Sequence, residues 1–302
     1  MNHHRTMRLT ALRGLLLSLV AAAFCLPLVW MLATSLRPTE TALQRSLAIL
    51  PTIRSDADSG ELSWFEARYW LTVAATLRDN FAAVWTSPLA DFPIYFKNSL
   101  YVSLLSAIGM TLSSAIVAFG FSRLRWRGRD GLFRVLLATM MIPFAVLMAP
   151  TYLVFKQLGW IGTLVPLWAP CWFGGAFSIF LVRQFYMTIP RELDEAAMLD
   201  GCSNWGILWR MIIPLSRPVL TVVALLQFVH SWNDFVGPLI FLNHEETYTL
   251  ALGLAMFQSS HGGTPWNLVM AADVIVILPV IVVFMLAQRA LIEGVASGGL
   301  KE

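Results

Sequence analysis

Acidic side chains that could recognise a partner gather in one short segment, residues 190–214, between two long apolar runs. They are Glu192, Asp194, Glu195 and Asp200. Carboxylates can form ion pairs and hydrogen bonds with a protein surface, and the small side chains of Ala196 and Ala197 would let a helix enter a groove. The segment is therefore a candidate docking element.

Helix signals divide this segment into two short helices. Pro190 suits the first turn of a helix, where the helix dipole also favours the acidic side chains. Gly201 stands where a left-handed residue would end that helix, and Ser203 can cap a second helix through Trp205. Pro214 is expected to end the second helix. An amphipathic connector lying in the lipid interface is the alternative, although such helices favour Lys and Arg on their polar face.

A second polar set follows in an apolar run. Gln227, His230, Asn233, Asp234 and Gly237 have the spacing of one helix face. Polar groups inside a membrane normally face a cavity or a partner, and with the rings of Trp232 and Phe235 they would suit a carbohydrate. Hydrogen bonding between helices is the alternative reading.

Other chemistry lacks its usual signatures. The five histidines are scattered, no H-E-x-x-H motif occurs, and no G-x-x-x-x-G-K-[ST] phosphate loop is present. Neither a catalytic residue nor a metal ligand is predicted, and the chain is not expected to be an enzyme. Cys25, Cys171 and Cys202 suggest no disulfide framework.

Composition indicates the elements that must position these residues. The chain of 302 residues is 57% hydrophobic and 13% charged, against about a quarter charged in soluble domains. A spanning helix needs about 20 apolar residues. An all-α polytopic membrane protein with six transmembrane helices follows, at about 12–36, 98–121, 132–155, 164–183, 219–241 and 270–292. Pro143 and Pro150 predict a kinked or broken third span.

The distribution of positive charge predicts the orientation. With the N-terminus in the cytoplasm, fourteen of the 21 Lys and Arg residues fall on the cytoplasmic side. Both termini and the 190–214 segment, between spans four and five, are then cytoplasmic. Residues 37–97 form a long extracytoplasmic loop. In it Leu62, Phe65, Tyr69, Val73, Leu77 and Val84 keep the spacing of an amphipathic helix.

The 190–214 segment also resembles a known family. Its sequence is Glu-Ala-Ala, three residues, Gly201, nine residues, then aliphatic-x-aliphatic-Pro214, with the milder variants Met211 and Ile213 near its end. This is similar to the signature loop of permease subunits of binding-protein-dependent ABC importers. From about Asn98 to the C-terminus the chain resembles the smaller permease of maltose-type sugar importers, including Trp232-Asn233-Asp234-Phe235 and the Gly298-Gly299-Leu300 tail.

The resemblance implies that residues 1–302 form one transmembrane domain and half of a sugar pathway. Residues 190–214 would be coupling helices in a cleft of an ATPase subunit. The coupling set would be Glu195, Ala196, Ala197, Asp200, Gly201, Trp205 and Pro214. The pathway set would be Gln227, His230, Trp232, Asn233 and Asp234.

Expected partners are a second homologous permease, two ATP-binding subunits, an extracytoplasmic solute-binding protein, the sugar and membrane lipid, with no nucleic acid. No cofactor is expected on this chain, because ATP and Mg would be bound by the ATPase subunits. The expected location is a bacterial or archaeal inner membrane. An importer of another solute, such as a polyol or a glycerol-phosphate ester, is the alternative. A stand-alone secondary transporter would need paired ionisable residues or inverted repeats, and a membrane enzyme would need clustered ligands.

Overall fold

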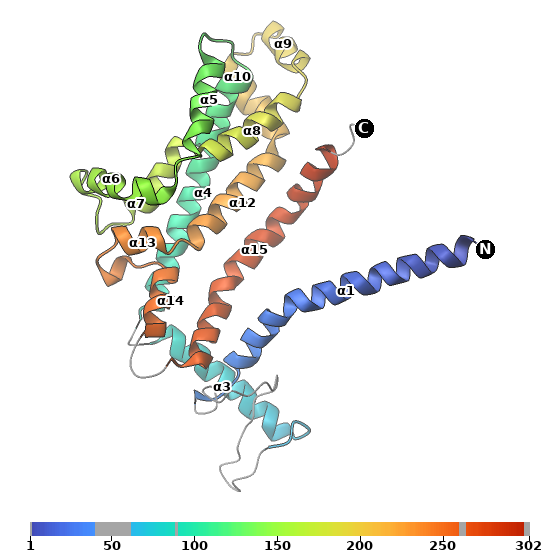
Figure 1. Ribbon diagram of the computed structural model, residues 1–302, viewed down its shortest axis with the longest axis vertical. Coiled ribbons are helices and arrows are strands. Elements are labelled where there is room, and N and C mark those ends of the chain that lie inside the picture. The colour runs from blue at the N-terminus through green and yellow to red at the C-terminus, as the bar shows by residue number, and fades with distance from the viewer. Residues whose placement is uncertain (1, 40–61, 88–89, 260–263, 299–302) are drawn as a thin grey trace. The chain divides into compact units, whose positions relative to one another are not determined.

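A computed structural model describes residues 2–39, 62–87, 90–259 and 264–298, and within these ranges the regular structure is entirely helical (Figure 1). The chain divides into two compact units, Met1–Ala90 with Leu254–Ile277, and Asp91–Gly253 with Leu278–Glu302. The predicted turn at residues 56–60 lies outside the described residues.

The first unit contains α1 (Asn2–Ser35), α3 (Ala67–Trp85) and parts of α14 (Leu250–Ser259) and α15 (Trp266–Gly298). Asn80 of α3 joins them. Its Nδ2 donates to the carbonyls of Ser35 and Arg37 at 2.8 and 3.0 Å, and its Oδ1 accepts a hydrogen bond from Asn267 Nδ2 at 3.1 Å. One buried amide thus connects the end of α1, α3 and the start of α15.

Helix α3 occupies the amphipathic stretch that the sequence predicted. Tyr69, Val73, Asn80 and Val84 are buried, whereas Phe65 and Leu77 are exposed. Phe65 precedes the first residue of the helix, so helical spacing does not apply to it. Burial raises the pKa of the Tyr69 phenol, which therefore stays neutral near pH 7.

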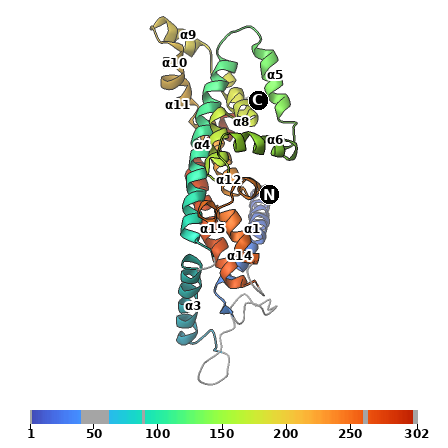
Figure 2. The same ribbon diagram turned by 90° about the vertical axis from the view of Figure 1, so that its left-hand side faces the viewer.

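The second unit is built around α4 (Phe92–Ser122), which packs along α8 (Ala176–Thr188) and α12 (Arg217–Trp232) (Figures 1 and 2). Close packing is possible because Ser99, Ser103 and Ser106 are small and buried. A Cβ added to Gly109 would collide with the Trp172 ring. The small-residue face of the second predicted span is therefore a packing surface.

Three predicted spans are interrupted. The third consists of α5 (Arg129–Thr139) and α6 (Phe144–Gln157), which meet at 99°. Pro143 precedes α6 and disfavours a helical conformation in the residue before it. The fourth contains α7 (Val165–Trp168), the 3₁₀ turn η1 (Ala169–Phe173) and α8, with left-handed Gly174 before α8.

The fifth predicted span, 219–241, is not one helix. It consists of α12, a break at residues 233–235, and α13 (Val236–Phe241). The predicted single face from Gln227 to Gly237 is therefore wrong beyond Trp232. After α13 come the 3₁₀ turn η3 (Glu245–Thr247) and α14.

Four helical segments are long and apolar enough to cross a membrane: Leu12–Ser35, Phe92–Ser122, Val165–Thr188 and Trp266–Gln288. Two bent pairs, Arg129–Thr139 with Phe144–Gln157 and Asn204–Leu215 with Arg217–Trp232, raise the number to as many as six. The described residues therefore contain four to six candidate spans. The second bent pair begins at Asn204, inside the 190–214 segment, so it differs from the predicted fifth span at 219–241.

Candidate functional site

The 190–214 segment folds as a helix, a tight turn and a second helix. The first helix, α9, is Glu192–Leu199, with Glu192, Asp194 and Glu195 in its first turn. Gly201 has a φ of +83°. Gly201 N donates to the Met198 carbonyl and Cys202 N to the Ala197 carbonyl, at 3.0 and 2.9 Å. These two bonds form a Schellman turn, which requires the left-handed residue that glycine supplies.

The second helix begins as predicted and ends within one residue of the predicted position. It comprises α10 (Asn204–Ile207), the π-helical segment η2 (Leu208–Ile212) and α11 (Ile213–Leu215). Ser203 Oγ accepts a hydrogen bond from Gly206 N at 3.2 Å and caps it. Pro214 is the penultimate residue of the helix, which ends at Leu215. Pro190 precedes the first residue of α9 by two positions.

One face of this helix pair is buried against the ends of α4, α8 and α12. Ala197, Ile207, Leu208 and Ile212 belong to a core cluster with Tyr186 and Val223. Ala197 is small, which lets α9 lie close to that core. The packing fixes which face of the pair remains outside.

Arg123, at the C-terminal end of α4, secures α9. Its Nη1 donates to Asp194 Oδ2 at 3.0 Å, and its Nη2 donates to the carbonyls of Tyr186 and Ile189 at 2.6 and 2.9 Å. Both side chains of this ion pair are nearly inaccessible, 4% exposed for Arg123 and 11% for Asp194. We call these contacts the Arg123 anchor.

The Arg123 anchor connects the end of α4, the end of α8 and the start of α9. A cation near the last carbonyls of α8 and an anion in the first turn of α9 are both favoured by the helix dipoles. In the sequence, Arg123 is one of several loop arginines, and nothing in the local pattern distinguishes it from Arg125 or Arg127. Only its partners, more than 60 positions away along the chain, distinguish it.

The outer face of the pair is exposed and partly apolar. Glu195, Ala196 and Asp200 are exposed. Beside them Leu199 is 90% exposed and Trp205 60% exposed, and Met198 is exposed as well. Exposed apolar side chains rimmed by charged ones mark interaction surfaces. The expected coupling set includes the exposed Trp205 but neither Met198 nor Leu199.

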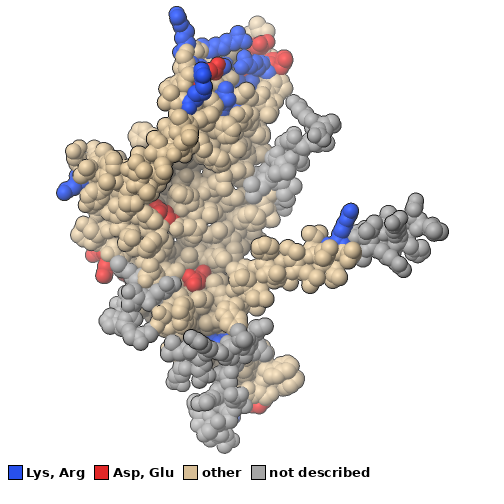
Figure 3. All heavy atoms as spheres, in the orientation of Figure 1, with Lys and Arg blue, Asp and Glu red and all other residues tan. Residues whose placement is uncertain are grey.

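A hollow of about 560 Å³ adjoins this surface. Glu195, Met198 and Asn204 line one side, and Arg125 and Trp126 line another. Figure 3 shows basic and acidic side chains together at this end of the second unit. The surface thus offers a recess, both signs of charge and an apolar ridge.

The pathway residues lie around the break between α12 and α13. Asn233 Nδ2 donates to the Val229 carbonyl at 2.8 Å, and Asp234 Oδ1 accepts a hydrogen bond from Gly237 N at 3.1 Å. Gly237 is required here, because a Cβ would meet the Asp234 carboxylate. Asn233 and Asp234 therefore stabilise the ends of two helices.

Gln227, His230 and Trp232 lie on α12 in different environments. Gln227 Nε2 donates to Ser231 Oγ at 3.0 Å, and His230 is exposed. Trp232 is 1% exposed and contacts the rings of Phe228 and Phe96. The Trp232 ring is thus covered within this chain, whereas Phe235 is partly exposed.

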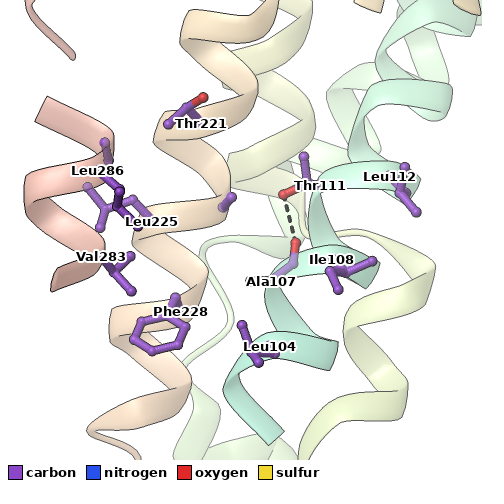
Figure 4. A pocket seen from close by; sticks show the side chains of 12 residues that line it. Leu104, Ala107, Ile108, Thr111, Leu112, Thr221, Leu225, Phe228, Val283 and Leu286 are labelled. Atoms are coloured by element: carbon purple, nitrogen blue, oxygen red, sulfur yellow. Dashed lines mark hydrogen bonds between the residues drawn. The ribbon is translucent and has the colours of Figure 1, made fainter. Parts of the chain in front are cut away.

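An apolar hollow of about 460 Å³ lies between α4, α12 and the last part of α15 (Figure 4). Its wall includes Leu104, Leu225, Phe228 and Val283. The hydroxyl of Thr111 donates to the Ala107 carbonyl of its own helix at 2.7 Å, and that of Thr221 to the Arg217 carbonyl at 2.8 Å. The protons of both hydroxyls are therefore used within their own helices, and the rest of the wall is apolar.

No group of three or more His, Cys, Asp or Glu side chains that could hold a metal ion occurs in the described part of the chain. The described residues bring together an exposed helix pair and a broken helix.

These features define a helical membrane protein with an exposed helix pair at one end. The chain belongs to the family of binding-protein-dependent transport system inner membrane components, which matches residues 107–297. It is therefore a transport component of an inner membrane.

Individual relatives fit this family. The chain is 33% identical over 225 residues to the trehalose/maltose transport system permease protein of Thermococcus litoralis, covering 74% of this chain and 81% of the relative. It is 30% identical to the lactose transport system permease protein of Rhizobium radiobacter, with coverage of 74% and 81%. It is 35% identical to the sn-glycerol-3-phosphate transport system permease protein of Agrobacterium fabrum, with coverage of 66% and 71%.

The fold is also similar to a solved structure, described as a bacterial ABC transporter involved in the import of the acidic polysaccharide alginate. The TM-score is 0.75 at 22% identity, over 93% of this chain and 95% of that one.

Proposed function

We propose that the chain is the membrane-spanning permease subunit of an ATP-driven sugar importer and forms half of its translocation pathway. The observation that carries this proposal is the α9–α10 pair, buried on one face, secured by the Arg123 anchor and exposed on the other. A movement of this pair can be transmitted to the spanning helices, because its buried side chains pack against α4, α8 and α12.

The proposed topology has six spans, both termini in the cytoplasm and the α9–α10 pair on the cytoplasmic side. The bent pair α5–α6 counts as span three, and α12 with α13 counts as span five. The excess of Arg in the segments that this topology assigns to the cytoplasm supports the orientation. Residues 37–97 then contribute α3 on the outer side, and residues 1–302 form one transmembrane domain.

Coupling is assigned to the exposed face of the pair. Glu195 would form an ion pair or hydrogen bond with an ATP-binding subunit, with Ala196, Leu199 and Trp205 in contact beside it. Ala197, Asp200, Gly201 and Pro214 would maintain the shape of the pair. Two such subunits bind ATP and Mg, and their closure would move α9 and, through the Arg123 anchor, α4 and α8.

The pathway is assigned to the break between α12 and α13. Non-helical backbone at membrane depth is tolerated where it is buried in protein or lines a water-filled cavity. His230, Asn233 and Asp234 would supply polar contacts and Phe235 an apolar surface, with Gln227 one turn away. Trp232 would support this wall from behind. A second homologous permease would complete the cavity, and a solute-binding protein would deliver the solute from outside.

Sugar is the proposed cargo because relatives named for trehalose/maltose and lactose transport cover most of this chain. The relative named for sn-glycerol-3-phosphate transport makes a glycerol-phosphate ester the second candidate. Identifying by mass spectrometry the ligand held by the cognate solute-binding protein distinguishes the two. A phosphate ester in that protein would contradict the sugar assignment.

The coupling assignment is tested with Glu195→Lys, and Asp79→Lys in α3 provides a control with the same change in charge. Truncating a desolvated charge at an interface costs about 2–5 kcal/mol. We therefore expect Glu195→Lys to abolish co-purification of the ATP-binding subunit with the tagged chain, together with sugar uptake by cells. Asp79→Lys should retain co-purification. Wild-type uptake by Glu195→Lys, or by the chain without any ATP-binding subunit, would rule out the proposed coupling.

A further inference from the structure

A second hollow of about 370 Å³ lies at the corner between α4 and α5 and shares Arg125, Trp126 and Arg191 with the hollow beside the α9–α10 pair. Three arginines line it, Arg125, Arg129 and Arg191, against one acidic side chain, Asp130. Trp126, Gly128 and Gly131 complete its wall. We call it the basic hollow. Figure 3 shows Lys and Arg gathered at this end of the second unit.

Hydrogen bonds to the protein hold two of these arginines in place. Arg129 Nε donates to Asp130 Oδ1 at 2.9 Å and its Nη1 to the Leu124 carbonyl at 3.3 Å. Arg191 Nη2 donates to the Ser122 carbonyl at 3.3 Å. A guanidinium carries five N–H donors. Both side chains are therefore oriented and still have donors available for a ligand.

The lining side chains of the basic hollow carry more positive than negative charge. Asp130 pairs with Arg129. Arg125 is exposed and makes no hydrogen bond or ion pair within the described part of the chain. Two positive charges thus remain, which favours an anion with several oxygen acceptors, such as a phosphate group.

The position of the hollow favours a lipid over a soluble phosphate. The apolar segment of α4 ends at Ser122, and the next candidate span begins at Arg129. The basic hollow therefore lies where the chain leaves and re-enters the membrane, the level at which tryptophan side chains such as Trp126 gather. On α5, Leu132 and Val135 are exposed and could lie against acyl chains.

We propose that the basic hollow binds the phosphate of an anionic phospholipid. The acyl chains of this lipid lie along the exposed apolar face of α5. Arg125, Arg129 and Arg191 donate to the phosphate oxygens. Basic hollows at the ends of spanning helices suit such headgroups. The proposed topology determines only which leaflet of the membrane supplies the lipid. The lipid site does not depend on the proposed cargo or on the coupling assignment.

The test measures binding of fluorescently labelled phosphatidylglycerol to the full-length chain in detergent micelles. Each Arg near a lipid surface contributes about 1 kcal/mol, so Arg125→Gln should weaken binding about fivefold. Gly131→Leu should weaken it further, because a Cβ at Gly131 meets no atom within 4 Å and the added side chain would occupy the hollow without a clash. Arg127→Gln is the matched control, since Arg127 belongs to the same loop and does not line the hollow.

Three competitors identify the ligand. Unlabelled phosphatidylglycerol should displace the probe, and phosphatidylcholine and inorganic phosphate should not. Displacement by inorganic phosphate at a comparable concentration would make this a small-anion site and overturn the lipid assignment. Equal weakening by Arg125→Gln and Arg127→Gln would indicate nonspecific attraction, and unchanged binding by a Gly131→Leu variant with wild-type thermal stability would exclude the hollow.

Discussion

At the scale of single residues, the buried pair Arg123–Asp194 shows why one charge among many can matter. The other arginines of the 123–129 loop are more accessible to solvent, whereas Arg123 and Asp194 are enclosed and form a hydrogen-bonded ion pair. Removing one member leaves the other charge buried without its partner, which costs far more than losing an exposed pair.

Asp194→Ala should destabilise the folded chain by about 3–5 kcal/mol, the usual cost of breaking a buried pair. The double variant Arg123→Met with Asp194→Leu should recover part of that loss, because no buried charge is left. Thermal unfolding of the purified chain in detergent measures both, with Arg78→Met as the exposed-pair control. The single variants Arg123→Met and Asp194→Leu complete the cycle, and additive effects of these two would show that the side chains do not interact.

Gly201 provides a second residue-scale prediction. Gly201→Ala should lower stability by about 1–2 kcal/mol, the cost of a left-handed conformation for a residue with a Cβ. A steric clash does not contribute, since a Cβ there meets no atom within 4 Å. Gly201→Asn should cost less than Gly201→Ala, because Asn tolerates this conformation better. Thermal unfolding of the three proteins tests the order, and equal stability of Ala and Gly would contradict the strain argument.

At the scale of elements, helices are connected by polar contacts that a hydrophobic pattern does not reveal. The Asn80 amide holds α3 to the end of α1 and to the start of α15. Asn98 has a similar role in the second unit. Its Nδ2 donates to the carbonyls of Glu246 and Tyr248 at 2.9 and 3.0 Å, which fastens the segment after α13 to α4.

Asn80→Leu should therefore destabilise the packing of α3 although leucine is a better helix former. Each buried group left without a partner costs about 1–3 kcal/mol, and here the carbonyls of Ser35 and Arg37 and the amide of Asn267 all lose a bond. Limited proteolysis within α3 should accelerate in Asn80→Leu and stay unchanged in Arg78→Leu, an exposed position in the same turn. Wild-type protection of Asn80→Leu would contradict the role of this amide.

At the scale of the whole molecule, the proposed topology places α3 outside the membrane and α9 in the cytoplasm. In a cysteine-free background, Arg68→Cys in α3 should react with a membrane-impermeant maleimide in intact spheroplasts. Asp200→Cys, which is exposed at the end of α9, should react only after permeabilisation. The opposite pattern would invert the topology, and reaction of both in intact spheroplasts would exclude the odd number of crossings that the proposed topology places between them.

The sequence predicted the class of protein and much of the 190–214 helix pair, because these depend on local rules. Apolar length predicted long apolar helices, glycine predicted the left-handed turn at Gly201, and a hydroxyl in the right place predicted the Ser203 cap. Pro214 predicted the end of the second short helix to within one residue. Local rules also explain one error: they continued one helical face past Trp232, where Asn233 and Asp234 instead stabilise a break.

The relations between distant residues were decided only by the tertiary structure. The sequence could count Arg123 among the loop cations, but only the fold brings it to Asp194 and to the last carbonyls of α8. The sequence suggested that the Trp232 ring is available to a sugar. In the structure, Phe228 and Phe96 pack against this ring and cover it. The periodicity of apolar residues depends on positions that are close together in the chain. The sequence can therefore indicate which residues face inward. The particular partners of a buried charge or ring depend on contacts between segments far apart in the chain, and those exist only once the helices have packed.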